Sequence, residues 1–146
     1  MPVVKLSQIR QAVAEQIDNL AGFKQSTFPV SLFGRTPNQL AHLAYSVSCT
    51  ASTARPDRQN IAVGVYVDTT VQITFAYRIR PANKLLDIDN AMDKEQDVIA
   101  AILASYSSIR SGMQISYQNT NRTFPESMEY MLIAIEFVSY HHIQGA

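Results

Sequence analysis

The sequence has no tryptophan, only one cysteine and few glycines, and neither sign of charge is in excess. A single cysteine cannot form a disulfide within the chain, which excludes a disulfide-rich secreted domain and makes a reducing compartment the expectation. The 12 basic and 12 acidic residues cancel, which excludes a strongly basic nucleic-acid binder and argues against acidic disorder. The longest apolar runs, such as 131–135, are too short to span a membrane, and segment 1–6 lacks the pattern of a signal peptide.

The chain has instead an unusually polar, weakly charged composition. Ser, Thr, Asn and Gln together outnumber the charged residues. A near-neutral surface of this kind is poorly protected against self-association, so the composition favours a subunit that assembles. The length suits one domain with one hydrophobic core, and we expect a single domain over 1–146.

Two segments have the apolar periodicity of a helix. The first is expected to begin with Ser7 as its N-cap and to stop at Gly22. Its apolar face is Leu6, Ile9, Val13, Ile17 and Leu20. The second is expected over 87–105, with Asp87 or Asp89 as its cap and an acidic front half that the helix dipole favours. Its expected buried face is Ile88, Met92, Val98, Ile99, Ile102 and Leu103.

Two long stretches, 39–54 and 61–80, alternate with the period of a strand, and 55–60 between them reads as a turn. The second would run about 65 Å as one strand, so either it bends near 68–70 or a long hairpin arm projects from the body. Pairing the apolar faces needs odd residues opposite odd ones, for example Thr53 opposite Ile61. The turn must then be odd in length or the hairpin must contain a bulge. An arm tip of Ala, Ser and Thr cannot form its own core, so we expect it to pack on something else, such as a neighbouring subunit.

The remaining segments complete a mixed architecture. Segment 23–37 reads as irregular or extended, 107–112 as a polar hinge, 113–117 as a short strand and 119–125 as a loop. The last strand, 128–140, is apolar on both parities, so we expect it to be central and covered on both faces. The order predicts an α+β fold: a mostly antiparallel sheet with a long β-hairpin, flanked by two helices on one face.

The sequence offers no catalytic constellation. Phosphate-binding glycine loops and nucleophile elbows are absent, and Cys49 reads as a small core residue. His141 and His142 are adjacent on a strand and point to opposite faces, which argues against a zinc site. The acidic run 87–97 reads as a capped, solvated helix face. We therefore predict no enzyme activity, no cofactor and no metal.

Five arginines form the one basic group that the sequence suggests. Arg78 and Arg80 are two apart and are expected to point the same way, opposite the apolar row. Arg55 and Arg58 lie with Asp57 in the turn, and Arg122 lies in the loop before the last strand. A solvated surface, a polar interface between subunits and a lumen that faces DNA all remain open for this group.

Several stretches in this order resemble the tail terminator, or tail-completion, proteins of tailed bacteriophages. They are the strand 71–81, the opening of a helix at 87–91, Arg122 in a loop and the strand 129–137. A helix before the sheet also fits. The resemblance covers most of the chain and rests on pattern and order rather than on one diagnostic motif.

The resemblance implies a structural virion protein. Such subunits form hexameric rings that cap a completed tail tube, end its polymerisation and link it to the head or neck. The implied partners are further copies of the chain, the tail-tube protein, a neck or head-completion protein and the sheath protein. Genomic DNA would pass through the lumen without sequence-specific binding, and no membrane is involved. The subunit would be made in the host cytoplasm and would become part of the tail or neck of the virion. The ring would form either from free subunits or only once they dock to a tube.

Two other functions stay open. One is another neck or tube component, such as a head-closure subunit, and the other is a small binding module or an enzyme of unrelated class. The residues expected at an interface or a lumen are Arg55, Asp57, Arg58, Arg78, Arg80 and Arg122.

Overall fold

The computed structural model describes residues 5–26, 41–54, 64–104, 114–124 and 129–144. In chain order the elements are α1 (Leu6–Asp18), β1 (Lys24–Gln25), β2 (Ala44–Ala54), β3 (Gly64–Arg78), the 3-10 helix η3 (Pro81–Asn83), α2 (Lys84–Ala104), β4 (Gln114–Thr123) and β5 (Tyr130–Gln144). The strands form one five-stranded sheet in the order β1-β2-β3-β5-β4, antiparallel except between β1 and β2. The predicted α+β fold with a mostly antiparallel sheet is confirmed.

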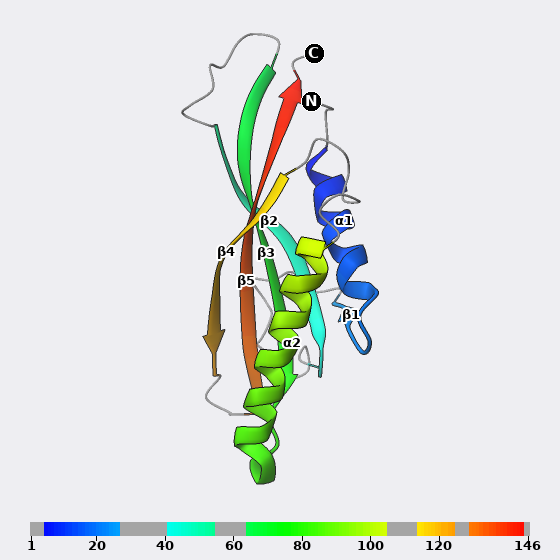
Figure 1. Cartoon of the computed structure of the whole chain (residues 1–146), viewed down its shortest axis with the longest axis vertical. Helices are drawn as coiled ribbons and strands as arrows, with labels where there is room; N and C mark the ends of the chain where they lie inside the picture. The colour runs from blue at the N-terminus through cyan, green and yellow to red at the C-terminus, as the bar shows by residue number, and fades with distance from the viewer. Residues whose placement is uncertain (1–4, 27–40, 55–63, 105–113, 125–128, 145–146) are drawn as a thin grey trace.

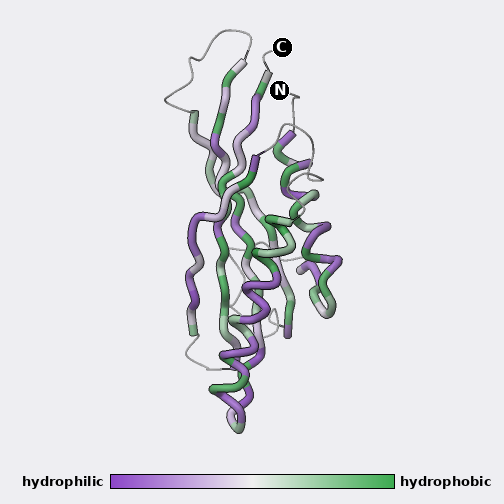
Figure 2. The backbone as a smooth tube through the Cα atoms, in the orientation of Figure 1, coloured by the Kyte–Doolittle hydropathy of each residue, from purple (hydrophilic) through white to green (hydrophobic). Residues whose placement is uncertain are grey.

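One face of the sheet is the hydrophobic core, and both helices cover it (Figures 1 and 2). Along β3 the odd-numbered residues point to this face, as the alternation predicts, and the odd-numbered residues of β5 do the same. The centre of the core consists of Ile9, Val13 and Ile17 of α1, Val98 and Ile102 of α2, Val71, Ile73 and Phe75 of β3, and Ile133, Ile135 and Phe137 of β5. None of the helices described in the structure is long and apolar enough to cross a membrane.

Both helices begin before the predicted caps. In α1 the N-cap is Lys5, whose N–H donates to the side-chain oxygen of Gln8 at 3.0 Å, and Ser7 lies inside the helix. α2 begins at Lys84, after η3, which has Pro81 at its first position. Proline fixes φ near the helical value, so the chain turns into a helix earlier than the carboxylates indicate. The predicted cap at Asp87 or Asp89 is therefore wrong.

The apolar face predicted for α1 is largely correct, but the face predicted for α2 is only partly so. Of its residues Val98 and Ile102 are buried, whereas Ile88, Met92 and Ile99 are half-buried. Leu6 and Leu103, each near one end of its helix, are exposed. The buried face of α2 includes two acidic residues that the prediction left out, and it consists of Asp87, Ala91, Glu95, Val98 and Ile102.

The hairpin of β2 and β3 contains the bulge that parity requires. Near its base, odd residues face odd ones, with Cys49 opposite Val71. The register then shifts between Cys49 and Ala51, so that Thr53 lies opposite Asp68. The expected pair of Thr53 with Ile61 is wrong, because Thr53 pairs seven residues further along the chain. The extra residue in β2 accounts for one of these positions, and a longer connection between the paired strands accounts for the other six.

The long strands continue past the helices as an arm, as Figure 1 shows. We call the arm the ends of β2, β3 and β5, at residues 50–54, 64–70 and 138–144. β3 is continuous over 15 residues, or about 50 Å, which favours the projecting arm over a break at 68–70. The sequence predicted a hairpin arm but missed its third strand, because β5 extends to Gln144 beside β3.

Two predictions for the last strands need correction. Residues 119–123 belong to β4, not to a loop; their polar side chains suit an exposed edge strand. β5 is central, between β3 and β4, but its even-numbered residues 132–138 are only half-buried because both helices lie on the odd face. The predicted turn at 55–60, the hinge at 107–112 and residues 27–37 of the extended segment lie outside the described residues.

Candidate functional site

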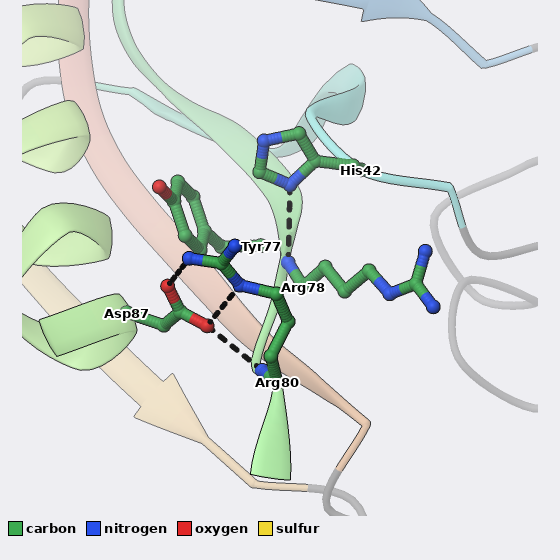
Figure 3. A pocket seen from close by; sticks show the side chains of 5 residues that line it. All are labelled: His42, Tyr77, Arg78, Arg80 and Asp87. Atoms are coloured by element: carbon green, nitrogen blue, oxygen red, sulfur yellow. Dashed lines mark hydrogen bonds and ion pairs between the residues drawn. The ribbon is translucent and has the colours of Figure 1, made fainter. Parts of the chain in front are cut away.

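A cavity of about 360 Å³ lies where the start of β2, the end of β3 and the start of α2 meet. Its lining residues are His42, Tyr77, Arg78, Arg80 and Asp87 (Figure 3). His42 directly precedes Leu43, whose φ of 61° lies in the left-handed region that disfavours branched side chains. The Leu43 side chain is buried in the core, whereas His42 is exposed beside the cavity. The strained turn therefore separates a core residue from a pocket residue.

Arg80 and Asp87 form one wall of the pocket. The Arg80 backbone N–H, Nε–H and Nη2–H all donate to the Asp87 carboxylate, at 2.8, 3.1 and 2.9 Å. The Asp87 side chain is 3% exposed and that of Arg80 is 57% exposed. These hydrogen bonds, first from the side chain and then from the backbone of Arg80, lower the pKa of Asp87 to about 2. The carboxylate thus stays ionised and fixes the guanidinium, whose Nη1 makes no bond to Asp87.

His42 forms the opposite wall. The Arg78 backbone N–H donates to its Nδ1 at 3.2 Å, and its ring meets the Tyr77 ring edge-on, with centroids 4.5 Å apart. Because Nδ1 accepts a hydrogen bond, the neutral imidazole has its proton on Nε2. The pKa of His42 is lowered, mainly by burial; Asp87 raises it, and the cations Lys94, Arg78 and Arg80 lower it.

The two arginines of this site do not point the same way. Arg78 is the last residue of β3, and Arg80 lies beyond the strand in the extended turn before Pro81. In Figure 3 the Arg80 guanidinium turns to Asp87, and the Arg78 side chain extends away from it. The expected common direction is wrong, because the strand ends between them. Both arginines also lie at the end of β3 opposite the arm, so they are not part of the arm.

Arg122, the third candidate in the described residues, is part of a separate ion pair. Its Nε–H and Nη2–H donate to the two carboxylate oxygens of Glu95, each at 2.7 Å. Glu95 is almost fully buried, and the Arg122 side chain is 42% exposed. The prediction of a solvated acidic face holds for Asp89, Asp93 and Asp97, which are exposed, but not for Asp87 and Glu95.

The remaining candidate residues lie partly outside the described ranges and partly within them. Arg55, Asp57 and Arg58 lie outside the described residues. Cys49 is half-buried, and burial raises the pKa of its thiol. Over the described ranges no three His, Cys, Asp or Glu side chains gather as a metal site.

The arm contains a polar interior that the sequence did not reveal. Thr69, Ser139 and His141 are fully buried on its odd face. On the even face the Tyr66 ring packs against those of Tyr140 and His142, with centroids 5.8 and 4.7 Å apart. His141 and His142 thus lie on opposite faces, as predicted. Both clusters contain residues of β5, the third strand of the arm, which the alternation of 61–80 does not predict.

No protein-family model matches the chain, and no curated protein matches it significantly. A functional assignment therefore depends on the residues and the fold.

Proposed function

We propose that the chain is a ring-forming structural subunit that caps a phage tail tube, as the tail terminator resemblance implies. The observation that supports the proposal most is the pair of open sheet edges. Within the described residues, β2 has a strand partner on its outer side only at Ala44 and Tyr45, and β4 has a partner only in β5. The two open edges belong to opposite sides of one sheet.

Both edges lack two of the usual protections against pairing with another chain, free charged side chains and proline. Edge strands are normally blunted by such residues or by β-bulges. Residues 46–54 of β2 include neither charge nor proline, and the one charged residue of β4, Arg122, is bound to Glu95. One bulge lies in each strand, which leaves uncharged stretches on both sides of it. Such edges favour β-strand addition by a partner.

Pairing between the two different edges would be heterologous. A head-to-tail contact repeats from subunit to subunit and forms a closed ring when the rotation returns to its start. Six copies follow from the resemblance alone. The arm, which projects past the helices, supplies further surface for a neighbour or the tube (Figure 1).

Lysines placed on each edge test this interface. Ala51→Lys on β2 and Gln118→Lys on β4 change exposed residues, and Gln96→Lys on the exposed face of α2 is the matched control. We expect the control to assemble like the parent chain and each edge variant to stay small while remaining folded. A mixture of the two edge variants retains one intact edge of each kind and should yield a one-to-one dimer. Unaltered assembly of both edge variants would contradict the proposal.

The turn that the sequence predicts at 55–60 offers a second test, in tail assembly. Replacing Arg55 and Arg58 by Glu should leave the monomer folded, because turn residues contribute little to a core. It should weaken ring formation or tail capping and give tails of uncontrolled length in complementation. Normal tail lengths with an unaltered ring would move the interface away from this turn.

Another neck or tube component and a small binding module remain the alternatives. The polar pocket beside His42 is the feature that favours a binding module. A chain that stays monomeric but binds a small ligand would favour that function over the ring.

A further inference from the structure

We infer that the pocket of His42, Tyr77, Arg78 and Arg80 binds a phosphate group, as free phosphate or as a small phosphate monoester. This site is separate from the sheet edges, and the inference does not depend on ring formation. It follows from the polarity of the groups that line the cavity and from the way each is held in place.

Hydrogen-bond donors dominate the wall of the pocket. His42 accepts the Arg78 N–H at Nδ1, so its Nε2–H is left as a donor. The Arg80 guanidinium is held by Asp87 through Nε and Nη2, which leaves the Nη1 hydrogens for another acceptor. Tyr77 adds a hydroxyl, and Arg78 contributes its positive charge beside the pocket rather than a fixed donor, because its side chain extends away from Asp87. A ligand that matches this set must be rich in acceptors.

Positive charge is in excess around the pocket. The charged groups that act on His42 are Asp87 and Lys94 of α2, and Arg78 and Arg80 at the end of β3. Three are cations, and the single carboxylate already accepts three hydrogen bonds from Arg80. The formal excess of two positive charges suits a doubly charged oxyanion better than a single carboxylate. Guanidinium groups match phosphate geometry particularly well.

The donors are preorganised. Asp87 is buried beneath Arg80 and fixes the guanidinium plane, and the Tyr77 ring edge together with the Arg78 N–H fixes the imidazole. Rigid donors lose little conformational entropy on binding, which favours affinity for a small ligand. The volume of about 360 Å³ is at the lower end for small-molecule sites, which leaves room for a phosphate with a short organic group.

NMR titration of the full chain tests the inference directly. The probes are sulfate, inorganic phosphate, glycerol phosphate and, as a singly charged control, acetate. The signals followed are the His42 imidazole and the Arg80 Nε–H. We expect saturable shifts of both with sulfate and phosphate, and much weaker ones with acetate. Tighter binding of glycerol phosphate than of phosphate would assign the pocket to a monoester, and the reverse order would assign it to the free ion.

Two arginine variants make the result specific to the pocket. Arg78→Gln removes an exposed cation at the site, whereas Arg10→Gln removes one from α1, at a distance. We expect Arg78→Gln to weaken sulfate binding about tenfold and Arg10→Gln to leave it unchanged. Bound sulfate should also raise the pKa of His42, because a dianion stabilises the imidazolium.

Three outcomes would overturn the inference. They are the absence of saturable shifts with any dianion, equal binding of acetate, and equal losses in the Arg78 and Arg10 variants. None of them bears on ring assembly, which is measured separately by mass, so failure of one proposal is distinguishable from failure of the other.

Discussion

Arg122 of β4 and Glu95 of α2 are joined by two hydrogen bonds of 2.7 Å that tie the outermost strand of the sheet to the helix layer. Glu95 lies two helical turns after Asp87, which Arg80 also binds through its guanidinium, so one ion pair anchors the start of α2 and the other its middle. The back half of the helix is held by apolar contacts of Val98 and Ile102 instead.

Breaking the Arg122–Glu95 pair from one side should destabilise the fold. Arg122→Met leaves the buried Glu95 carboxylate without its partner, and we expect the free energy of unfolding to fall by about 1–3 kcal/mol. The double variant Arg122→Met/Glu95→Leu should recover much of this loss, because no charge remains buried. Urea unfolding measures both. Asp93→Asn, on the exposed face, is the control and should change stability little.

Tyr45 should be a second strong contact between layers. Its ring is fully buried, and its hydroxyl contacts the Asp18 carboxylate and the Ala14 carbonyl oxygen of α1. Burial, followed by the hydrogen bond with Asp18, raises the pKa of Tyr45 above its usual range. Tyr45→Phe keeps the ring and removes these contacts, so we expect a loss of about 1–3 kcal/mol in thermal or urea unfolding. An unchanged midpoint would show that the hydroxyl contributes nothing to holding α1.

Gly64, at the start of β3, is predicted to be sensitive to substitution. A Cβ at this position would overlap the His142 imidazole. Gly64→Ala should therefore displace His142 from Tyr66 and shift the NMR signals of both rings. The double variant Gly64→Ala/His142→Ala removes the clash and should be more stable than Gly64→Ala alone. Equal stability of Gly64→Ala and the parent chain would contradict this packing of the arm.

Stability should fall with acid in two steps. Burial lowers the pKa of both His42 and His141 below 6.5, so the unfolded chain binds more protons and the fold weakens as pH falls through about 6.5. The pKa of Asp87 is lowered to about 2, so its contribution is present above its ordinary pKa and is lost as pH falls from 3.8 towards about 2. Melting temperatures across this range measure the profile. His141→Gln should flatten the upper step; an identical profile would contradict the role of His141.

Part of this architecture can be predicted from the sequence, because the spacing of apolar residues determines which side of a strand or helix faces the core. The alternation of 61–80 placed Val71, Ile73 and Phe75 on the core face, and the parity argument required a bulge if the turn was not odd. Neither its position, between Cys49 and Ala51, nor the length of the connection between the strands is encoded in any apolar pattern, so the pairing of the arm was predicted wrongly. β4 was cut short for a related reason: residues 119–123 are an edge strand with polar side chains and no alternation.

The candidate site could be predicted only in fragments. Arg78 and Arg80 were singled out as cations, but their partners depend on tertiary contacts that no local pattern shows. One signal was present: Asp87, Ala91, Glu95, Val98 and Ile102 share one helical face. Acidic residues on the stripe that continues as the apolar core require buried partners, and this spacing indicates both ion pairs. His42 belongs to no sequence motif, so nothing in the sequence indicated that it lines the pocket.

The most direct test of the central claim is native mass spectrometry of the full chain across a range of concentrations. The account predicts a single closed species at a defined multiple of 16.3 kDa, six-fold by the resemblance, which is lost in Ala51→Lys and in Gln118→Lys and kept in Gln96→Lys. A chain that stays at 16.3 kDa throughout, or an oligomer that both edge variants leave intact, would contradict assembly through the two open edges.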